Sequence, residues 1–288
     1  MYPILFKPII KNLIWGSESW DISCREKDMG VIENGSLSGM SFIDVINSDK
    51  ASLLGQKFIN TDVFPLLVKI IDAKKNLSIQ VHPDDIYAQK IENVPYGKNE
   101  SWYIREPGPG FLIIGLNSGV TKEMLKEALN NGTAEDCFNK LPIKKGDLIH
   151  IEAGLSHAIT GGVKLLEIQQ NSDTTYRVYD YNRLGDDGKP RELHVDKALD
   201  VINFDLEPRE NTYYSCEKLV VSDSLKQQTN GSGFFIFTCV KGCAEFVTNG
   251  EKTVVPVERS VFIPASLGEF VIKNAGCGCC ELIKTMPL

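Results

Sequence analysis

Short apolar runs bounded by turn residues dominate the pattern of this chain. In its first part they predict strands at residues 64–71, 77–81, 101–105, 110–115, 147–151 and 163–170. In its last part they predict strands at residues 233–240, 243–248, 253–257, 260–263 and 270–272. Many short strands separated by glycine-containing turns are typical of sandwiches and barrels, so we expect a mainly β fold.

The hydrophobic period changes to that of a helix at one place between these strands. Apolar residues between Met124 and Leu129 recur at helical spacing after Thr121, whose side chain can cap a helix N-terminus. Gly132 predicts the end of this helix, and a further helical turn is expected at residues 134–139. A short helix is also expected at residues 194–202.

A polar stretch, residues 205–211, divides the two groups of strands and resembles a linker in composition. We therefore predict a first domain at residues 1–205, with a helical piece near residues 121–140, and a second domain at residues 206–288. One segment of the first domain, residues 146–154, has a possible echo in the second domain at residues 256–266: both read as a turn, a short strand and a small-residue turn, but the second has no histidine. If both are copies of one fold, only the first can hold a metal.

Composition narrows the classes of function. The chain has 288 residues and a net charge of −7, which argues against broad binding to nucleic acid. No apolar stretch approaches the roughly 20 residues that span a bilayer. Lysines and prolines interrupt the apolar N-terminus, so we expect no signal peptide, no membrane contact and a cytoplasmic location.

Five of the eight cysteines lie in the C-terminal part of the chain at suggestive positions. Cys277, Cys279 and Cys280 form a cluster, and Cys239 and Cys243 lie upstream. A four-thiolate zinc site is conceivable, but Cys-x-Cys-Cys is not the usual spacing of such sites. In an intracellular protein we expect reduced, buried thiols instead.

Candidate metal ligands lie at three places in the first domain. Gln80 and His82 would share one face of a strand, because strand side chains alternate with period two. Glu100 shares a face with Lys98 by the same rule, and His157 follows a glycine turn. Two imidazoles, a carboxylate and an amide oxygen suit Zn2+ or another borderline divalent ion. Each residue taken alone could equally be a hydrogen-bonded core or surface residue.

The segment from Glu167 to Arg183 is unusually polar for its strand-like flanks. Its arginines, tyrosines and glutamines suit a polyhydroxylated, anionic ligand, because arginine pairs geometrically with phosphate. The alternative is a turn that satisfies its own backbone, with Arg177 in an ion pair. The two remaining histidines, His150 and His194, are expected to be structural or surface residues.

Six stretches, taken together and in order, resemble the type I mannose-6-phosphate isomerases (phosphomannose isomerases) in their short bacterial form. They are residues 15–20, 64–73, 77–85, 97–103, 153–159 and 166–183. The resemblance implies two cupin-like jelly-roll barrels, the first catalytic with a small helical segment and the second metal-free. The last 80 or so residues match only in their general strand pattern.

The resemblance also implies one Zn2+ ion per chain. Its ligands would be Gln80, His82, Glu100 and His157. Arg177 matches an arginine that is essential for turnover, and Lys98 matches the active-site lysine. The chain departs from the common pattern at two positions: Glu152 replaces a proline in the turn before the second histidine, and Arg183 replaces a lysine.

The implied activity is interconversion of mannose 6-phosphate and fructose 6-phosphate through a cis-enediol. Lys98 is a candidate for moving protons, and Arg177 would stabilise the developing charge or position the sugar. Glu167 is a candidate second proton carrier, with an ion pair to Arg177 as the equal alternative. Ser78 and Arg183 are candidate contacts of the substrate phosphate.

Two other classes of function stay open from the residues. One is a cupin that binds sugars without turnover. The other is an iron cupin oxygenase, for which His82, Glu100 and His157 could supply the usual two-histidine, one-carboxylate set. Gln80 as a fourth ligand and Lys98 beside the metal favour the isomerase. The sequence does not indicate the oligomeric state or the identity of the catalytic base.

Overall fold

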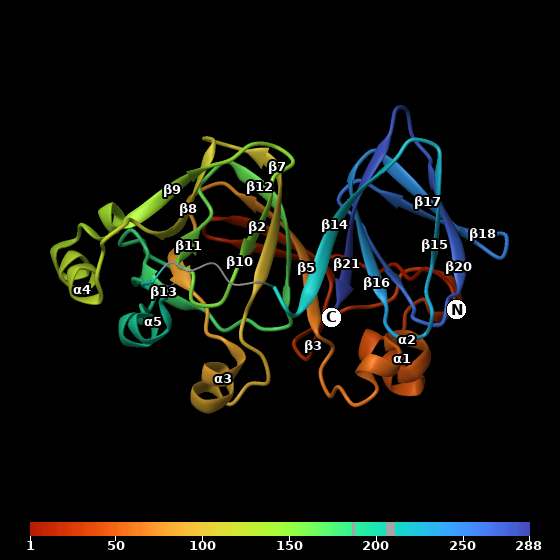
Figure 1. Cartoon of the computed structure of the whole chain (residues 1–288), viewed down its shortest axis with the longest axis horizontal. Helices are drawn as coiled ribbons and strands as arrows, with labels where there is room; N and C mark the ends of the chain where they lie inside the picture. Colours follow the sequence, from red (N-terminus) through yellow and green to blue (C-terminus); the bar gives the residue numbers. More distant parts are fainter. Residues whose placement is uncertain (186–187, 206–210) are drawn as a thin grey trace. The chain divides into compact units, whose positions relative to one another are not determined.

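The computed structural model of this chain describes residues 1–185, 188–205 and 211–288. Short strands make up most of it, as Figure 1 shows. The strands before residue 180 are β1 (Ile9–Leu13), β2 (Gly16–Ile22), β3 (Cys24–Arg25), β4 (Asp28–Met29), β5 (Leu66–Ala73), β6 (Ile79–Val81), β7 (Glu100–Pro107), β8 (Phe111–Leu116), β9 (Phe138–Pro142), β10 (Leu148–Ile151), β11 (His157–Ala158), β12 (Val163–Gln170) and β13 (Tyr176–Tyr179). The mainly β class is therefore confirmed.

Eight further strands follow residue 211, and short helices occur at intervals along the chain. The later strands are β14 (Tyr214–Val221), β15 (Ser224–Gln228), β16 (Phe235–Lys241), β17 (Cys243–Thr248), β18 (Glu251–Pro256), β19 (Ser260–Ile263), β20 (Glu269–Asn274) and β21 (Cys280–Pro287). The helices are α1 (Phe42–Ser48), α2 (Lys50–Leu54), α3 (Asp85–Tyr87), α4 (Lys122–Asn131) and α5 (Val195–Val201), with shorter turns η1 (Gly35–Leu37), η2 (Gln56–Phe58), η3 (Ala88–Glu92) and η4 (Ala134–Cys137).

The chain divides into two compact units that interleave along the sequence. Unit 1 contains Met1–Ile9, Ser19–Lys69 and Thr212–Leu288, and unit 2 contains Ile10–Glu18 and Ile70–Asn211. This division differs from the predicted one, which placed residues 1–205 together. The predicted linker falls partly on residues 206–210, which lie outside the described residues.

Backbone pairing and one arginine explain why the N-terminal segments belong to unit 1. Ile4 forms an isolated β-bridge with Phe262 of β19. Arg259 donates hydrogen bonds to the carbonyl of Phe6 at 2.6 Å and to the carboxylate of Glu33 at 2.5 Å. The N-terminal segments therefore complete the packing of the C-terminal strands, a long-range arrangement that no local pattern reveals.

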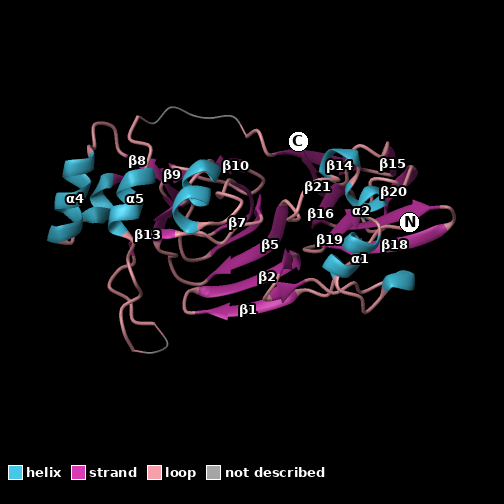
Figure 2. Cartoon of the chain, turned by 90° about the horizontal axis from the view of Figure 1, so that it is seen from below, coloured by secondary structure: helices cyan, strands magenta, loops and turns pink. Residues whose placement is uncertain are grey.

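Unit 2 is built on two sheets. One has the order β1-β2-β5-β12-β7-β10, with residues of β1, β2 and β5 divided between the units, and the other has the order β13-β6-β11-β8-β9. An apolar cluster that includes Trp102, Leu112 and Leu165 joins residues of both sheets. A second cluster packs the five-stranded sheet against helices α4 and α5, through residues such as Leu125 and Leu199. Figure 2 shows these helices beside β13 and β8.

Unit 1 contains a second pair of sheets. Their orders are β14-β21-β16-β19 and β15-β20-β17-β18. Their interior is apolar and rich in phenylalanine: the ring centroid of Phe237 lies 5.4 Å from that of Phe246 and 6.0 Å from that of Phe270. Both units thus pair two sheets, and the assignment of each pair to a cupin jelly roll stays a prediction.

The predicted helix after Thr121 is present as α4. The Thr121 side chain accepts a hydrogen bond from the Met124 amide, and Gly132 ends the helix in the left-handed conformation at φ 75°. The helical turn expected at residues 134–139 is shorter, because β9 begins at Phe138. Among the described residues no helix is long and apolar enough to cross a membrane.

Candidate metal centre

Strand alternation carries the candidate ligands to one face of the five-stranded sheet. Ile79 and Val81 of β6 pack in the cluster beneath α4 and α5. Gln80, between them, therefore projects from the opposite face of the strand. His157 is its direct cross-strand partner on β11, and Arg177 is its partner on β13. Three of the predicted site residues thus lie side by side across three neighbouring strands.

The other sheet supplies the carboxylate. Trp102 and Ile104 of β7 lie in the core shared by the two sheets, so Glu100 at the start of β7 faces the same interior. On the adjacent strand β12, Gln169 is paired with Glu100 and Glu167 with Trp102. The interior of unit 2 is therefore apolar at one end and polar at the other.

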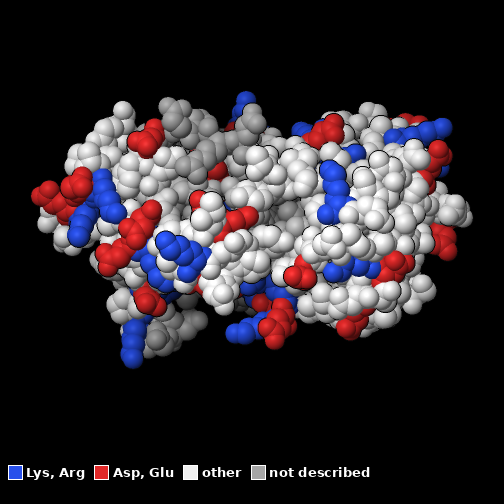
Figure 3. All heavy atoms as spheres, turned by 60° about the horizontal axis from the view of Figure 1, so that its bottom comes forward, with Lys and Arg blue, Asp and Glu red and all other residues white. Residues whose placement is uncertain are grey.

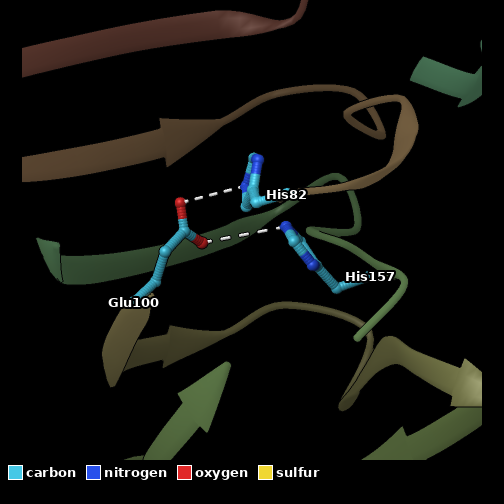
Figure 4. A group of neighbouring side chains, drawn as sticks. All are labelled: His82, Glu100 and His157. Atoms are coloured by element: carbon cyan, nitrogen blue, oxygen red, sulfur yellow. Dashed lines mark ion pairs between the residues drawn. The ribbon is translucent and has the colours of Figure 1, made fainter. Parts of the chain in front are cut away.

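His82, Glu100 and His157 converge at this polar end, as Figure 4 shows. His82 Nε2 lies 3.3 Å from Glu100 Oε1, and His157 Nε2 lies 3.7 Å from Glu100 Oε2. All three ligand atoms lie within 4.8 Å of one another, and all three side chains are buried. Such a spacing places one oxygen and two nitrogens around a single point, which is the arrangement that a divalent metal requires.

Backbone carbonyls orient both imidazoles. The Nδ1 atom of His82 is 2.9 Å from the carbonyl oxygen of Thr174, and that of His157 is 2.8 Å from the carbonyl oxygen of Leu155. A ring nitrogen that meets a carbonyl carries the proton, so each Nε2 presents a lone pair toward Glu100. Metal-binding histidines are characteristically held in this way.

Burial and nearby charges keep these groups in the forms that bind metal. Burial, helped by the Lys98 charge, lowers the pKa of His82 to about 3, and burial also lowers the pKa of His157. Burial acts to raise the pKa of Glu100, but Lys98 and the imidazoles outweigh it and hold this pKa well below its usual range. At neutral pH the triad is therefore two neutral imidazoles and a carboxylate.

The glycine turn before His157 forms despite Glu152. The Leu155 amide donates to the carbonyl of Glu152 at 3.1 Å, and the Gly154 amide donates to the carbonyl of His82 at 2.9 Å. Gly154 adopts φ 88°, and a Cβ there would lie 3.0 Å from the carbonyl oxygen of Val201. The turn therefore depends on the glycine, and its amide ties the two histidine segments together.

Lys98, Gln80 and Ser78 border the triad. Lys98 is buried and forms an ion pair with Glu100 Oε1, while its Nζ lies 3.4 Å from His82 Nε2. The amide nitrogen of Gln80 lies 3.3 Å from His157 Nε2, and its Oε1 accepts a hydrogen bond from the Ser78 hydroxyl at 3.4 Å. Gln80 would therefore ligate a metal through Oε1 only after its side-chain amide rotated to bring this oxygen toward the triad.

Glu167 and Arg177 belong to different sheets. Glu167 is buried, and its Oε2 accepts a hydrogen bond from the indole nitrogen of Trp102 at 2.9 Å. Arg177 is half-buried on β13 and donates to the carbonyl of Glu192 at 3.4 Å. Glu167 thus lies on the same strand face as Gln169, whose cross-strand partner is the candidate ligand Glu100. The proton-carrier role predicted for Glu167 stays a prediction.

Arg183 has strong partners that the sequence reading missed. It forms an ion pair with Asp180 and donates to the carbonyl of Asn76. Asp180 is buried and also accepts two hydrogen bonds from Arg191, at 2.6 and 2.7 Å. The spacing of three residues between Asp180 and Arg183 was a visible signal, whereas Arg191 is eleven positions from Asp180 and no local pattern links the two.

The remaining histidines and the cysteines have other surroundings. His150 Nδ1 lies 3.3 Å from the Ser101 hydroxyl, and His194 Nδ1 accepts a hydrogen bond from the Arg177 amide at 3.2 Å. All eight cysteines are free thiols, but the expectation of burial is wrong for Cys277, which is exposed, and for Cys243 and Cys279, which are half-buried. Among the described residues the single group of three or more histidine, cysteine or acidic side chains close enough for a metal is the His82–Glu100–His157 triad. The four-thiolate arrangement is therefore absent from the described chain.

Paired β-sheets around a buried His–Glu–His triad define a mainly β protein, and the three side chains of the triad are close enough to bind a metal. The model of the type I phosphomannose isomerase catalytic domain matches residues 7–109. The probable mannose-6-phosphate isomerase GmuF of Bacillus subtilis is 32% identical over 99% of both chains. Mannose-6-phosphate isomerase ManA of the same organism is 33% identical over 94% of this chain and 96% of its own.

A solved structure agrees with these sequence relatives. The crystal structure of mannose 6-phosphate isomerase from Bacillus subtilis superposes with a TM-score of 0.88 at 30% identity, and covers 99% of both chains. The chain therefore belongs to the family of type I mannose-6-phosphate isomerases. The family resemblance predicted from the sequence is confirmed.

Proposed function

We propose that this chain is an enzyme that interconverts mannose 6-phosphate and fructose 6-phosphate, with one Zn2+ ion at the triad. The observation that carries the proposal is the buried His82–Glu100–His157 triad with Lys98 against it. Full-length likeness to relatives that bear the name of this isomerase supports it. A sugar-binding protein without turnover would not need a buried lysine beside a metal.

The donor set fits a zinc ion. Two imidazole nitrogens and a carboxylate are common zinc ligands, and a neutral amide oxygen from Gln80 would complete a set of four. Both oxygens of Glu100 are buried and accept no hydrogen bond within the described part of the chain, although cationic and imidazole groups lie beside them. When bound, zinc would polarise oxygens of the sugar and lower the cost of the developing negative charge.

The protein's own groups would then handle the proton. In the proposed reaction a proton passes between C2 and C1 through a cis-enediol. Lys98 would hold or move that proton at Nζ, and Glu167 is the second candidate carrier at its carboxylate. The Trp102 indole donates a hydrogen bond to one oxygen of Glu167 and so holds this buried carboxylate on β12. Arg177, opposite Gln80, would stabilise the enediolate charge.

The phosphate of the substrate would be held by few cations in a protein of net charge −7. Ser78 lies next to Gln80 and can donate its hydroxyl, and Arg183 lies beyond it against Asn76. Both stay candidate phosphate contacts. Acidic and basic side chains are interspersed on the face shown in Figure 3, which supports the proposal of a small-molecule substrate rather than nucleic acid. A cytoplasmic location belongs to the same proposal.

A coupled assay for fructose 6-phosphate formed from mannose 6-phosphate tests this function. We expect turnover by the zinc-loaded protein, loss of turnover after treatment with a chelator, and recovery when zinc is returned. Arg177→Ala should abolish turnover while the zinc content stays at that of the wild type, and Lys126→Ala, an exposed control, should change neither.

No turnover by the zinc-loaded wild type would refute the proposal. Turnover that needs iron and dioxygen would instead establish the oxygenase alternative, which the same two-histidine, one-carboxylate set could serve. Zinc lost from Arg177→Ala would show that this arginine supports the metal site rather than the reaction.

A further inference from the structure

Asp180 lies between two guanidinium groups in unit 2. Arg191 approaches its carboxylate as a fork, with Nε 2.7 Å from Oδ2 and Nη2 2.6 Å from Oδ1. Arg183 pairs with the same Oδ1 and donates from Nε to the Asp180 carbonyl at 3.4 Å. Both arginines are only half-buried, whereas Asp180 is 4% exposed. One buried carboxylate therefore fixes two cations that reach the surface.

Positive charge is in excess around this carboxylate. Arg177 is a third neighbour: burial lowers its pKa, and the nearby Arg191 charge contributes to the same effect. The bonds to Asp180 and Asn76 leave N–H groups of Arg183 and Arg191 without a partner among the described residues. Two guanidiniums share the single negative charge of this carboxylate, so the group keeps a net positive charge that favours an anion.

The cluster of Arg177, Arg183 and Arg191 is aligned with the candidate metal centre. Arg177 is the cross-strand partner of Gln80. Arg183 contacts the carbonyl of Asn76, which precedes Gln80 by four residues in the sequence. A ligand with its reacting carbons at the metal and an anionic group at its other end would therefore extend along β6 and β13 toward these arginines.

We propose that Arg191 binds the substrate phosphate together with Arg183, and that Asp180 is the positioning residue that holds both guanidiniums for it. This inference rests on the proposed function, because the phosphate is that of the sugar substrate. The pKa of Asp180 agrees with its role: burial acts to raise it, but the bonds to Arg191 and Arg183 hold it below its usual range. Asp180 thus stays ionised at neutral pH.

The first test measures inorganic phosphate binding to the metal-free protein, by titration calorimetry and 31P NMR. We expect Arg191→Gln to weaken phosphate binding by about tenfold to a hundredfold, the usual range for a charge-assisted contact. Arg191→Lys should restore part of the loss, because it keeps the charge without the fork. Arg25→Gln removes one positive charge from unit 1 and should bind phosphate as the wild type does.

The second test uses the zinc-loaded enzyme with mannose 6-phosphate. Arg191→Gln should raise KM by about tenfold or more and change kcat much less. Asp180→Asn should raise KM similarly, and Asp180→Glu should recover part of it. Phosphate affinity and KM that equal those of the Arg25→Gln control, with only a lower melting temperature, would overturn the inference. Absence of turnover in the wild type would refute the proposed function instead, and the phosphate titration would still decide the role of Arg191.

Discussion

The two units pair their sheets in the same general way but fill the interior differently. In unit 2 the interior positions of β6, β11 and β7 carry Gln80, His157 and Glu100. In unit 1 the interior of β16 and β17 carries Phe237 and Phe246. The same period-two alternation thus builds a core in one unit and a site in the other, and side-chain polarity decides which.

The buried carboxylates sharpen this contrast. Glu100 in unit 2 has a lysine and two imidazoles around it, and its pKa is held well below the usual range. In unit 1, burial raises the pKa of Asp21 to about 6, because one arginine and the Ser260 amide compensate it only in part. A buried carboxylate with a lowered pKa remains charged and able to bind a cation, whereas one with a raised pKa weakens the fold as it ionises.

The largest effect is expected from removing the carboxylate of the metal centre. Glu100→Gln should release the metal and lower activity by more than about 100-fold, since loss of a mere outer-shell partner costs roughly 10- to 100-fold. Metal analysis and the coupled assay measure both quantities. Zinc retained at one ion per chain in this variant would show that Glu100 is not a ligand.

A large effect on stability, rather than on metal binding, is expected in the apolar interior of unit 1. Phe237→Ala should lower the free energy of unfolding by about 3–5 kcal/mol, because it leaves a cavity in a fully buried aromatic cluster. Denaturant unfolding measures this change, and metal content should equal that of the wild type. Val254→Ala, at a half-exposed position, is the control and should cost far less. Loss of metal from Phe237→Ala would contradict the view that the core of unit 1 stabilises the fold without supporting the metal centre of unit 2.

A smaller effect depends on pH. The pKa of Asp21 is about 6 in the folded chain against 3.8 as the ordinary value, so the folded state holds this proton more tightly. Its ionisation therefore destabilises the fold as pH rises from about 4 to about 6. Asp21→Asn has no carboxyl to ionise and so avoids this loss of stability. The free energy of unfolding of the variant, minus that of the wild type, should therefore rise by roughly 2–3 kcal/mol between pH 4 and pH 7. Urea unfolding at both values gives the difference, and an unchanged difference would refute the shift.

The smallest effect is expected at the cysteine-rich turn of unit 1. Cys279 is half-buried and accepts a hydrogen bond from Lys241 at 3.7 Å, but the cysteines there do not form a metal-binding group. Cys279→Ser should leave zinc at one ion per chain and leave activity unchanged. Loss of a bound metal ion from this variant would restore the four-thiolate alternative.

Local patterns were sufficient for much of the metal centre. His82 follows a short apolar strand, Glu100 begins another, and His157 follows a glycine turn, so each position could be read from alternation and turn residues. Their convergence could not be read from spacing alone, because it depends on the pairing of β6 with β11 and on the packing of their sheet against the sheet that contains β7. The resemblance to the isomerase family, and not the periodicity, indicated that these three residues lie together.

Other parts of the fold depend on contacts distant in sequence. β21 was missed because Lys284 interrupts its apolar pattern, and the structure places that ammonium 4.2 Å from the ring centroid of Phe235. The N-terminal strands were missed because they are short and half-exposed. The contact of Arg191 with Asp180 was missed because the two residues are eleven positions apart in the sequence and no local pattern links them.

The position of the bound metal decides whether the triad is its binding site. Anomalous diffraction from crystals of the zinc-loaded protein, recorded on both sides of the zinc absorption edge, would locate it. We predict one strong peak per chain, within coordination distance of His82 Nε2, His157 Nε2 and the Glu100 carboxylate. A peak at the cysteine-rich turn of unit 1, or no peak at the triad in fully active crystals, would contradict it.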